Sequence, residues 1–293
     1  MKTGKGYQGE VVKLKRILLI TDGLLIVGLI ILYGWKSGLL RQIYLATATE
    51  ALLVKHGDHT VQIRFDLKEH MNQVYIPAGE FTMGADTNFI GTKPHKVYLN
   101  AYWIDQVDVT NSMYALCLQA GQCKHPARYD NYFDDPKFAD YPVVYVNWYA
   151  AQGFCTWKSE RLPTEAEWEK AARGLDGRPY PWGKGSPDIS LLNYNGDHQD
   201  IVSAYDYLIG ISPYGLLQMS GNVRQWVSDW YGRNYYSISP YKDPQGPDSG
   251  KYKSLRGGAF NDDSQEVETF YRAYHDPKSA GQDRGFRCAQ SAP

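Results

Sequence analysis

The sequence predicts an α+β fold with little regular secondary structure, preceded by one transmembrane helix. The chain of 293 residues contains 24 tyrosines, 8 tryptophans and 28 glycines but only 5 methionines, a profile typical of aromatic-packed loops and glycine turns. With 43% hydrophobic residues, the chain is long enough to bury a large core. Its net charge of -1 gives no basic surplus, which argues against nucleic acid as a partner. An apolar run near the N-terminus is followed by short helix and strand signals.

Residues 17–35 form an apolar run about as long as a bilayer-spanning helix. Basic residues are more frequent before this run than after it, so the positive-inside rule places residues 1–16 in the cytoplasm. The chain is therefore expected to cross the cell membrane once, with its C-terminal domain outside. A cleaved signal peptide is the alternative, but the small residues at 46–48 lie too far from the run.

Asp22 lies inside the apolar run, where an ionised carboxylate is costly. Two interpretations stay open. Either Asp22 is protonated or reaches the interface, or a partner helix in the membrane supplies it with a hydrogen-bond donor. The second interpretation predicts integral membrane proteins as partners.

Residues 36–73 are expected to form a stem, and residues 74–293 the extracytoplasmic domain. In the stem, residues 39–53 have the apolar spacing of a helix, and residues 61–65 alternate as a short strand. In the domain, residues 97–104 are expected to form a strand. Three helices should begin at residues that commonly cap helices, namely Thr110 or Asn111, Asn147, and Thr164 with Glu167.

Six motifs follow one another in an order that resembles the formylglycine-generating enzyme (sulfatase-modifying factor) family. They are RLPTEAEWE, YPWG, YGL followed by GNV, RGGAF, YR and GFRC, within residues 74–289. The resemblance implies a C-type-lectin-like architecture. In active members, the chemistry belongs to two cysteines after the Gly-Gly pair, and the matching positions here hold Asp262 and Val267. These side chains cannot bind a soft copper ion or exchange disulfides, so the domain is expected not to be an enzyme.

The four cysteines are even in number and lie in the expected extracytoplasmic domain, which suggests two disulfide bonds. Cys117 and Cys123 are close enough in sequence for a local bridge. In the family, a cysteine in the helix before the RLP motif pairs with one after Gly-Phe-Arg, and Cys155 and Cys288 match these positions. A catalytic thiol is the alternative, but neither of these two cysteines has a histidine nearby in sequence.

Active relatives hold two structural calcium ions. At one site, Gln225 stands at the glutamate ligand, Gln218 at the asparagine or aspartate ligand, and Arg224 replaces an aromatic residue, so calcium binding should be weak. No cofactor is therefore expected to be required, but the binding of one structural calcium ion at a second site stays an open alternative. Its ligands would be Asn193, Tyr194, and Asp197 or Asp200, in a stretch that also reads as a simple turn.

Arg256, Tyr271 and Arg272 match positions that border the family's substrate groove. Four acidic residues make this groove acidic, namely Asp262, Asp263, Glu266 and Glu268. The alternative is a solvated loop. The main hypothesis is a non-catalytic, membrane-anchored interaction module, an accessory or structural subunit of a membrane protein complex. A lectin-like binder of glycans or peptides is the alternative. An active formylglycine-generating oxidase is less expected, because it needs two thiols that this chain does not have at the matching positions. A sulfur-transfer oxidase of the ergothioneine type would need a second helical domain.

Overall fold

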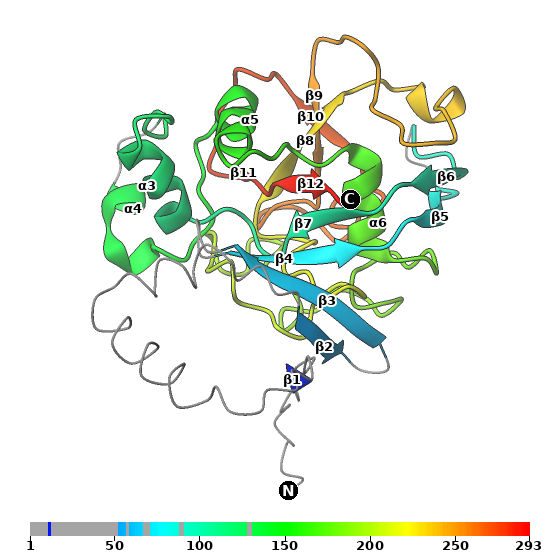
Figure 1. Ribbon diagram of the computed structural model, residues 1–293, viewed down its shortest axis with the longest axis horizontal. Coiled ribbons are helices and arrows are strands. Elements are labelled where there is room, and N and C mark those ends of the chain that lie inside the picture. Colours follow the sequence, from blue (N-terminus) through cyan, green and yellow to red (C-terminus); the bar gives the residue numbers. More distant parts are fainter. Residues whose placement is uncertain (1–10, 13–51, 57–58, 67–70, 88–90, 128–130) are drawn as a thin grey trace, which may run out of the picture.

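The structure is a computed structural model that describes residues 11–12, 52–56, 59–66, 71–87, 91–127 and 131–293 (Figure 1). The apolar run at residues 17–35, Asp22 and most of the expected stem lie outside these residues. The longest helix within them, α5 (Trp148–Trp157), has 10 residues, about half of what a bilayer crossing requires. Accordingly, none of the helices in the described segments could span a membrane.

An antiparallel sheet of six strands forms one layer of the domain, in the order β1-β2-β3-β4-β7-β12. Its strands are β1 (Val11–Val12), β2 (Leu52–His56), β3 (His59–Asp66), β4 (Met71–Ile76), β7 (Tyr102–Asp105) and β12 (Ala289–Ser291). The strand predicted at residues 61–65 is confirmed within β3. The helix expected at residues 39–53 is wrong for Leu52 and Leu53, because their backbone belongs to the hairpin that β2 forms with β3.

The sheet continues into the part of the chain that was assigned to the stem. Strand β3 pairs with β4, and β4 pairs with β7 of the domain. At the edge of the sheet, β1 pairs with β2, with Val11 opposite Val54. This pairing differs from the predicted topology, in which a membrane separates residues 1–16 from the domain.

A second sheet has the order β10-β9-β8-β11, with β11 parallel to β8 and the other pairs antiparallel. Its strands are β8 (Arg224–Trp230), β9 (Lys253–Arg256), β10 (Ala273–His275) and β11 (Arg284–Phe286). A separate hairpin joins β5 (Gly79–Met83) and β6 (His95–Leu99). The short helical segments are α4 (Asn131–Asp134), η1 (Pro136–Phe138) and η2 (Tyr235–Ser237).

The three predicted helix starts are confirmed. Helix α3 (Asn111–Gln119) is capped by Thr110, α5 by Asn147, and α6 (Glu165–Arg173) by Thr164 in a capping box. In Figure 1, α6 lies between the β5–β6 hairpin and the second sheet, and it contacts both. All nine residues of α6 are buried, so its charged side chains need partners inside the protein.

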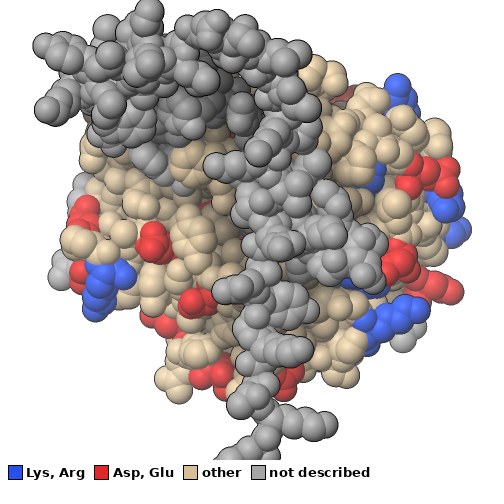
Figure 2. Space-filling view, turned by 60° about the horizontal axis from the view of Figure 1, so that its bottom comes forward, with Lys and Arg blue, Asp and Glu red and all other residues tan. Residues whose placement is uncertain are grey.

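The surface carries charges of both signs. On the face that Figure 2 shows, acidic and basic side chains are interspersed among uncharged ones. The core below is formed by apolar side chains of both sheets and of α6, with Trp168 and Trp226 completely buried. The observed mixture of short helices, short strands and long loops agrees with the predicted α+β class.

Candidate functional site

The two positions that match the family's cysteines lie against one glycine turn. Gly258 has φ +70°, and a Cβ built on it would lie 2.7 Å from Val267 Cγ1. Val267 is completely buried, and Ser220 Oγ donates a hydrogen bond to its carbonyl oxygen at 2.7 Å. Asp262 Oδ2 accepts a hydrogen bond from the backbone N–H of Ala259 at 2.8 Å. The structure therefore brings Asp262 and Val267 to the same turn and packs both closely.

Arg224 pairs with the carboxylate at the first of these positions. Its guanidinium, on β8, forms an ion pair with Asp262 Oδ1 and a second one with Asp283 Oδ2 at 2.6 Å. Glu266 Oε1 lies 3.9 Å from the same guanidinium. Burial raises the pKa of Asp262 to about 6, while the charge of Arg224 acts in the opposite direction. Asp283 could not be recognised from the sequence, because no motif links it to Arg224.

A polar cavity of about 390 Å³ opens beside this cluster. Tyr271 lies in its wall and donates from its hydroxyl to Glu266 Oε1 at 3.1 Å. Tyr274, also in the wall, stacks on Tyr231 with ring centroids 4.2 Å apart, and the ring of Tyr252 lies 5.1 Å away. The cavity thus combines charged groups with a stack of tyrosines that sequence reasoning did not single out.

Arg256, which was expected to border the groove, does not line this cavity. Its guanidinium is completely buried and donates to Glu165 at 3.1 Å and to Glu169 at 2.7 Å. Arg272 lines the cavity, but its guanidinium points inward and donates to both carboxylate oxygens of Glu165, at 2.7 and 2.9 Å. The cause is α6, because two of its buried carboxylates, those of Glu165 and Glu169, take these arginines as cationic partners.

Gln225 is fully used by protein groups at the position of the family's calcium ligand. Its Oε1 accepts hydrogen bonds from Trp168 Nε1 at 2.6 Å and from Arg287 Nε at 2.7 Å. Its Nε2 donates to the carbonyl oxygen of Gln218 at 2.9 Å. The Nε2 group of Gln225 thus lies where a glutamate at this position would turn its second carboxylate oxygen toward a cation. These residues do not fit calcium at this site.

The other candidate calcium ligands present a mixed picture. Asn193 is buried, and its Oδ1 has no hydrogen-bond partner among the described residues. The carbonyl of Tyr194 accepts from the backbone of Asp197 at 3.1 Å, as in a turn. Asp200 Oδ1 accepts from the backbone N–H of Ile201 and from Gln282, both at 2.7 Å. The Asn193 oxygen is thus buried without a partner among the described residues, while the side chains of both aspartates are exposed.

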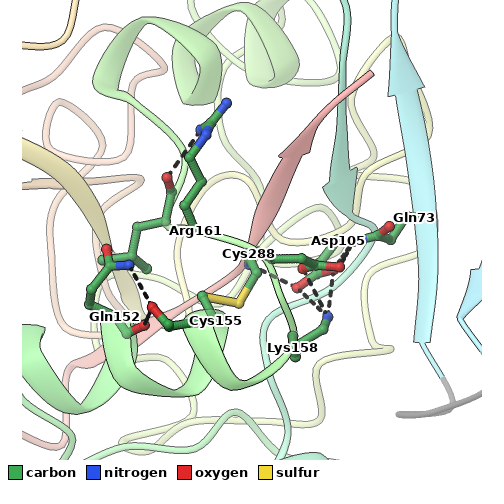
Figure 3. The surroundings of a disulfide bond; sticks show 10 residues. Gln73, Asp105, Gln152, Cys155, Lys158, Arg161 and Cys288 are labelled. Carbon is green, nitrogen blue, oxygen red and sulfur yellow. Dashed lines mark hydrogen bonds and ion pairs between the residues drawn. A yellow bond between two sulfur atoms is a disulfide. The ribbon is translucent and has the colours of Figure 1, made fainter. Parts of the chain in front are cut away.

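Both predicted disulfides are present, with Cα atoms 5.3 Å apart in Cys117–Cys123 and 5.6 Å apart in Cys155–Cys288. Figure 3 shows Asp105 and Lys158 beside the second bond, and both side chains are buried. Ligand atoms of Asp105, Glu160 and Cys288 lie within 4.8 Å of one another, as in a metal site. However, the Cys288 sulfur is bonded to Cys155, and the Lys158 ammonium lies 3.2 Å from each carboxylate. The lysine supplies the cation that this cluster needs.

Comparisons with known proteins identify the family of this domain. Residues 62–292 match the family model described as the sulfatase-modifying factor enzyme 1-like domain. The chain is 33% identical over 236 residues to the serine/threonine-protein kinase pkn1 of Chlamydia caviae, a match that covers 74% of this chain and 37% of that protein. It is 31% identical over 283 residues to the formylglycine-generating enzyme of Streptomyces coelicolor, covering 75% of this chain and 89% of the enzyme. The chain thus spans well under half of the chlamydial relative.

Solved structures show the same fold. PvdO from Pseudomonas aeruginosa superposes with a TM-score of 0.66 at 23% identity, covering 78% of this chain and 98% of PvdO. Treponema denticola variable protein 1 gives a TM-score of 0.61 at 22% identity, covering 81% of this chain and 98% of that one. With the family model matched over most of its length, the chain belongs to the family of proteins that carry a sulfatase-modifying factor enzyme 1-like domain.

Proposed function

We propose that this protein is a non-catalytic member of the family that acts as an extracytoplasmic interaction module. One observation carries the proposal: all four cysteines of the chain are joined in two disulfides, one local and one between α5 and the C-terminal segment. No thiol remains to bind copper or to attack a substrate. In place of the first cysteine, Asp262 forms a buried ion pair with Arg224.

Aldehyde formation tests this proposal. The copper-loaded protein would be incubated with a Cys-x-Pro-x-Arg peptide, with the Streptomyces coelicolor enzyme as the positive control. We expect no aldehyde above the level of a reaction without protein. Turnover above that level would overturn the proposal, because it would require chemistry without a free thiol.

We further propose that residues 17–35 anchor the protein in the cell membrane and that Asp22 packs against integral membrane partners. Residue 12 gives a direct test, because the native cysteines are all bonded and a cysteine introduced there is the single free thiol. If residues 17–35 span the membrane, a membrane-impermeant reagent labels Val12→Cys only from the cytoplasmic side. Labelling from outside would reject the anchor and favour the pairing of β1 with β2.

The partnership of Asp22 is tested by co-purification in mild detergent. Replacing Asp22 with leucine should leave membrane insertion intact, because it removes a costly carboxylate from the apolar run. The same change should reduce the amount of co-purifying membrane proteins. Unchanged association, or a native protein that runs as a lone monomer, would reject the role as an accessory subunit.

A lectin-like surface is the second candidate function, and the tyrosine stack beside the polar cavity favours it. Tyr274 is 48% exposed, yet its ring is held by Tyr231 and Tyr252. A fixed, exposed ring next to charged side chains suits a sugar or a peptide that stacks and forms hydrogen bonds. Binding to an oligosaccharide array should then fall with Tyr274→Ala and persist with Tyr241→Ala, which removes an exposed tyrosine outside this cavity.

A further inference from the structure

A second cavity, of about 440 Å³, lies away from Asp262 and from the tyrosine stack. Its walls are the loop at residues 122–127, the start of α5, and residues 278–280. Apolar and aromatic side chains dominate the lining, among them Tyr114, Tyr145, Val146, Tyr149, Ala150 and Ala280. A cavity of this size and lining is typical of sites for small molecules, which span about 300–1,000 Å³.

The walls of this cavity are tied together by the backbone. Tyr145 has φ 57°, a left-handed conformation that is rare for a bulky residue. In this conformation its carbonyl accepts from Ala127 N at 2.9 Å, and its N–H donates to the Gly281 carbonyl at 3.0 Å. One residue therefore joins the loop at 122–127 to the segment that follows residue 280. Strained backbone of this kind clusters at ligand sites.

A disulfide and a hydrogen bond fix the remaining wall. Cys123, which lines the cavity, is bonded to Cys117 of α3. The hydroxyl of Tyr114 donates to the carbonyl of Lys124 at 3.1 Å. The cavity is thus pre-formed, and a ligand would pay little conformational entropy to order it.

The described part of the lining carries positive charge. Lys124 and Lys278 both belong to it, and none of its described residues is a carboxylate. Among the described residues, neither ammonium forms an ion pair. His125 also belongs to the lining, and its Nε2 lies 3.3 Å from a carboxylate oxygen of Asp134, which does not. Two free cations therefore lie at an aromatic cavity in a chain whose net charge is -1.

We infer that this cavity binds a carboxylate carried on an aromatic or apolar group. The apolar walls would enclose the ring or side chain, and the two lysines would pair with the carboxylate. The same chemistry occurs in a free aromatic acid and in the C-terminal residue of a peptide that ends in phenylalanine. The inference does not depend on the proposed function, because it uses none of the groups near Asp262.

Gly153 offers a way to fill the cavity without harming the fold. It lies on α5 and lines the cavity, and an added Cβ would meet no atom within 4 Å. Leucine is also a better helix former than glycine, so Gly153→Leu should keep or raise the melting temperature. Gly153→Ala is the matched control, because it brings at least the same gain in helix propensity but fills little of the space.

The experiment measures binding of 4-fluorophenylacetate to the purified full-length chain by fluorine NMR. The native protein and Gly153→Ala should bind with similar affinity, and Gly153→Leu should bind at least about tenfold more weakly. Replacing both lysines, as Lys124→Gln with Lys278→Gln, should weaken binding by about tenfold, as expected for two exposed ion pairs. The lysine variant also serves as an independent test if Gly153→Leu does not fold.

Further ligands separate the sources and define the failure. 4-Fluorobenzyl alcohol and 4-fluorobenzylamine should bind much more weakly than the carboxylate. A peptide that ends in a free C-terminal phenylalanine is compared with its amide form and with phenylacetate. If the free peptide binds more tightly than both, the ligand is a peptide terminus. The reverse ranking identifies a free acid. Three outcomes would each overturn the inference. The alcohol binds as tightly as the carboxylate, a folded Gly153→Leu protein binds the carboxylate as tightly as the native protein does, or neither the free acid nor the peptide binds at millimolar concentration.

Discussion

Replacing Gln225 with glutamate would restore a carboxylate at the position where the family carries a calcium ligand. In the native protein, the Nε2 group of Gln225 donates to the carbonyl oxygen of Gln218 at 2.9 Å. In the variant, a carboxylate oxygen would face this carbonyl oxygen at the same place. Two acceptors at hydrogen-bond distance repel each other unless a cation lies between them. We therefore expect Gln225→Glu to be destabilised without calcium and to be rescued by it.

The size of the effect follows from the contacts. A buried acceptor left without a donor costs about 1–3 kcal/mol, and the charge-assisted bond from Arg287 to the new carboxylate offsets part of this. A net loss of about 2 kcal/mol corresponds to a fall of about 4–8 °C in melting temperature for a domain of this length. Calcium at about 100 times its dissociation constant would return about 2.7 kcal/mol, enough to cancel the loss.

The assay compares melting temperatures in EGTA and in calcium for three proteins. The native protein should change little, since at most the site at Asn193 could respond. Gln225→Glu should be less stable in EGTA and recover in calcium. Gln225→Leu, which removes the acceptor for Trp168 and Arg287, should be destabilised equally in both buffers. A native protein that loses many degrees in EGTA, or a Gln225→Glu variant indifferent to calcium, would refute the reasoning.

Three other predictions concern the stability of the domain. Replacing both Cys155 and Cys288 with alanine should lower the free energy of unfolding by about 4–5 kcal/mol, because the bond closes a long loop. Urea unfolding measures this change, and a loss near zero would contradict the prediction. Arg256→Met should cost about 3–5 kcal/mol in the same assay, since it leaves the buried Glu165 with one cationic partner fewer. Burial raises the pKa of Glu268 from 4.5 to about 7, so the folded state binds this proton more tightly than the unfolded state does. The contribution of the protonated carboxyl to the free energy of unfolding is therefore lost as pH rises through about 7. Glu268→Gln should therefore be more stable than the native protein at about pH 8 but not at about pH 4, and equal gains at both would exclude this titration.

Local signals in the sequence predicted much of the fold. The caps at Thr110, Asn147 and Thr164 start helices because a side-chain oxygen satisfies backbone N–H groups within the next few residues. The long disulfide was found only through the resemblance, since its cysteines are 133 residues apart. The extension of the sheet through β2 and β3 was missed, because residues 39–53 show a periodicity that fits a helix until pairing partners are known.

The candidate site was harder to predict, because sequence motifs do not show in which direction a charged side chain points. Arg256 and Arg272 both match groove positions, yet both guanidinium groups face Glu165 in the interior. Asp283 reaches Arg224 from 59 residues away in the chain, and no spacing rule connects the two. The positive cavity at residues 122–127 likewise depends on three segments that only the fold brings together.

Two neighbouring residues of β8 account for the altered site. Adjacent side chains of a strand point to opposite faces, so Arg224 reaches Asp262 on one side while Gln225 reaches Arg287 on the other. Each places a protein hydrogen-bonding group where the resemblance implies an ion. Restoring a cysteine at residue 262 alone would leave the Arg224 guanidinium without one carboxylate partner, and Val267, packed against Gly258, would still supply no second thiolate. Copper prefers soft ligands, so a single thiolate beside a guanidinium is a poor site for it. On the proposed function, the side chains at 224, 225, 262 and 267 therefore act together, because each is engaged in polar contacts or packing within the protein.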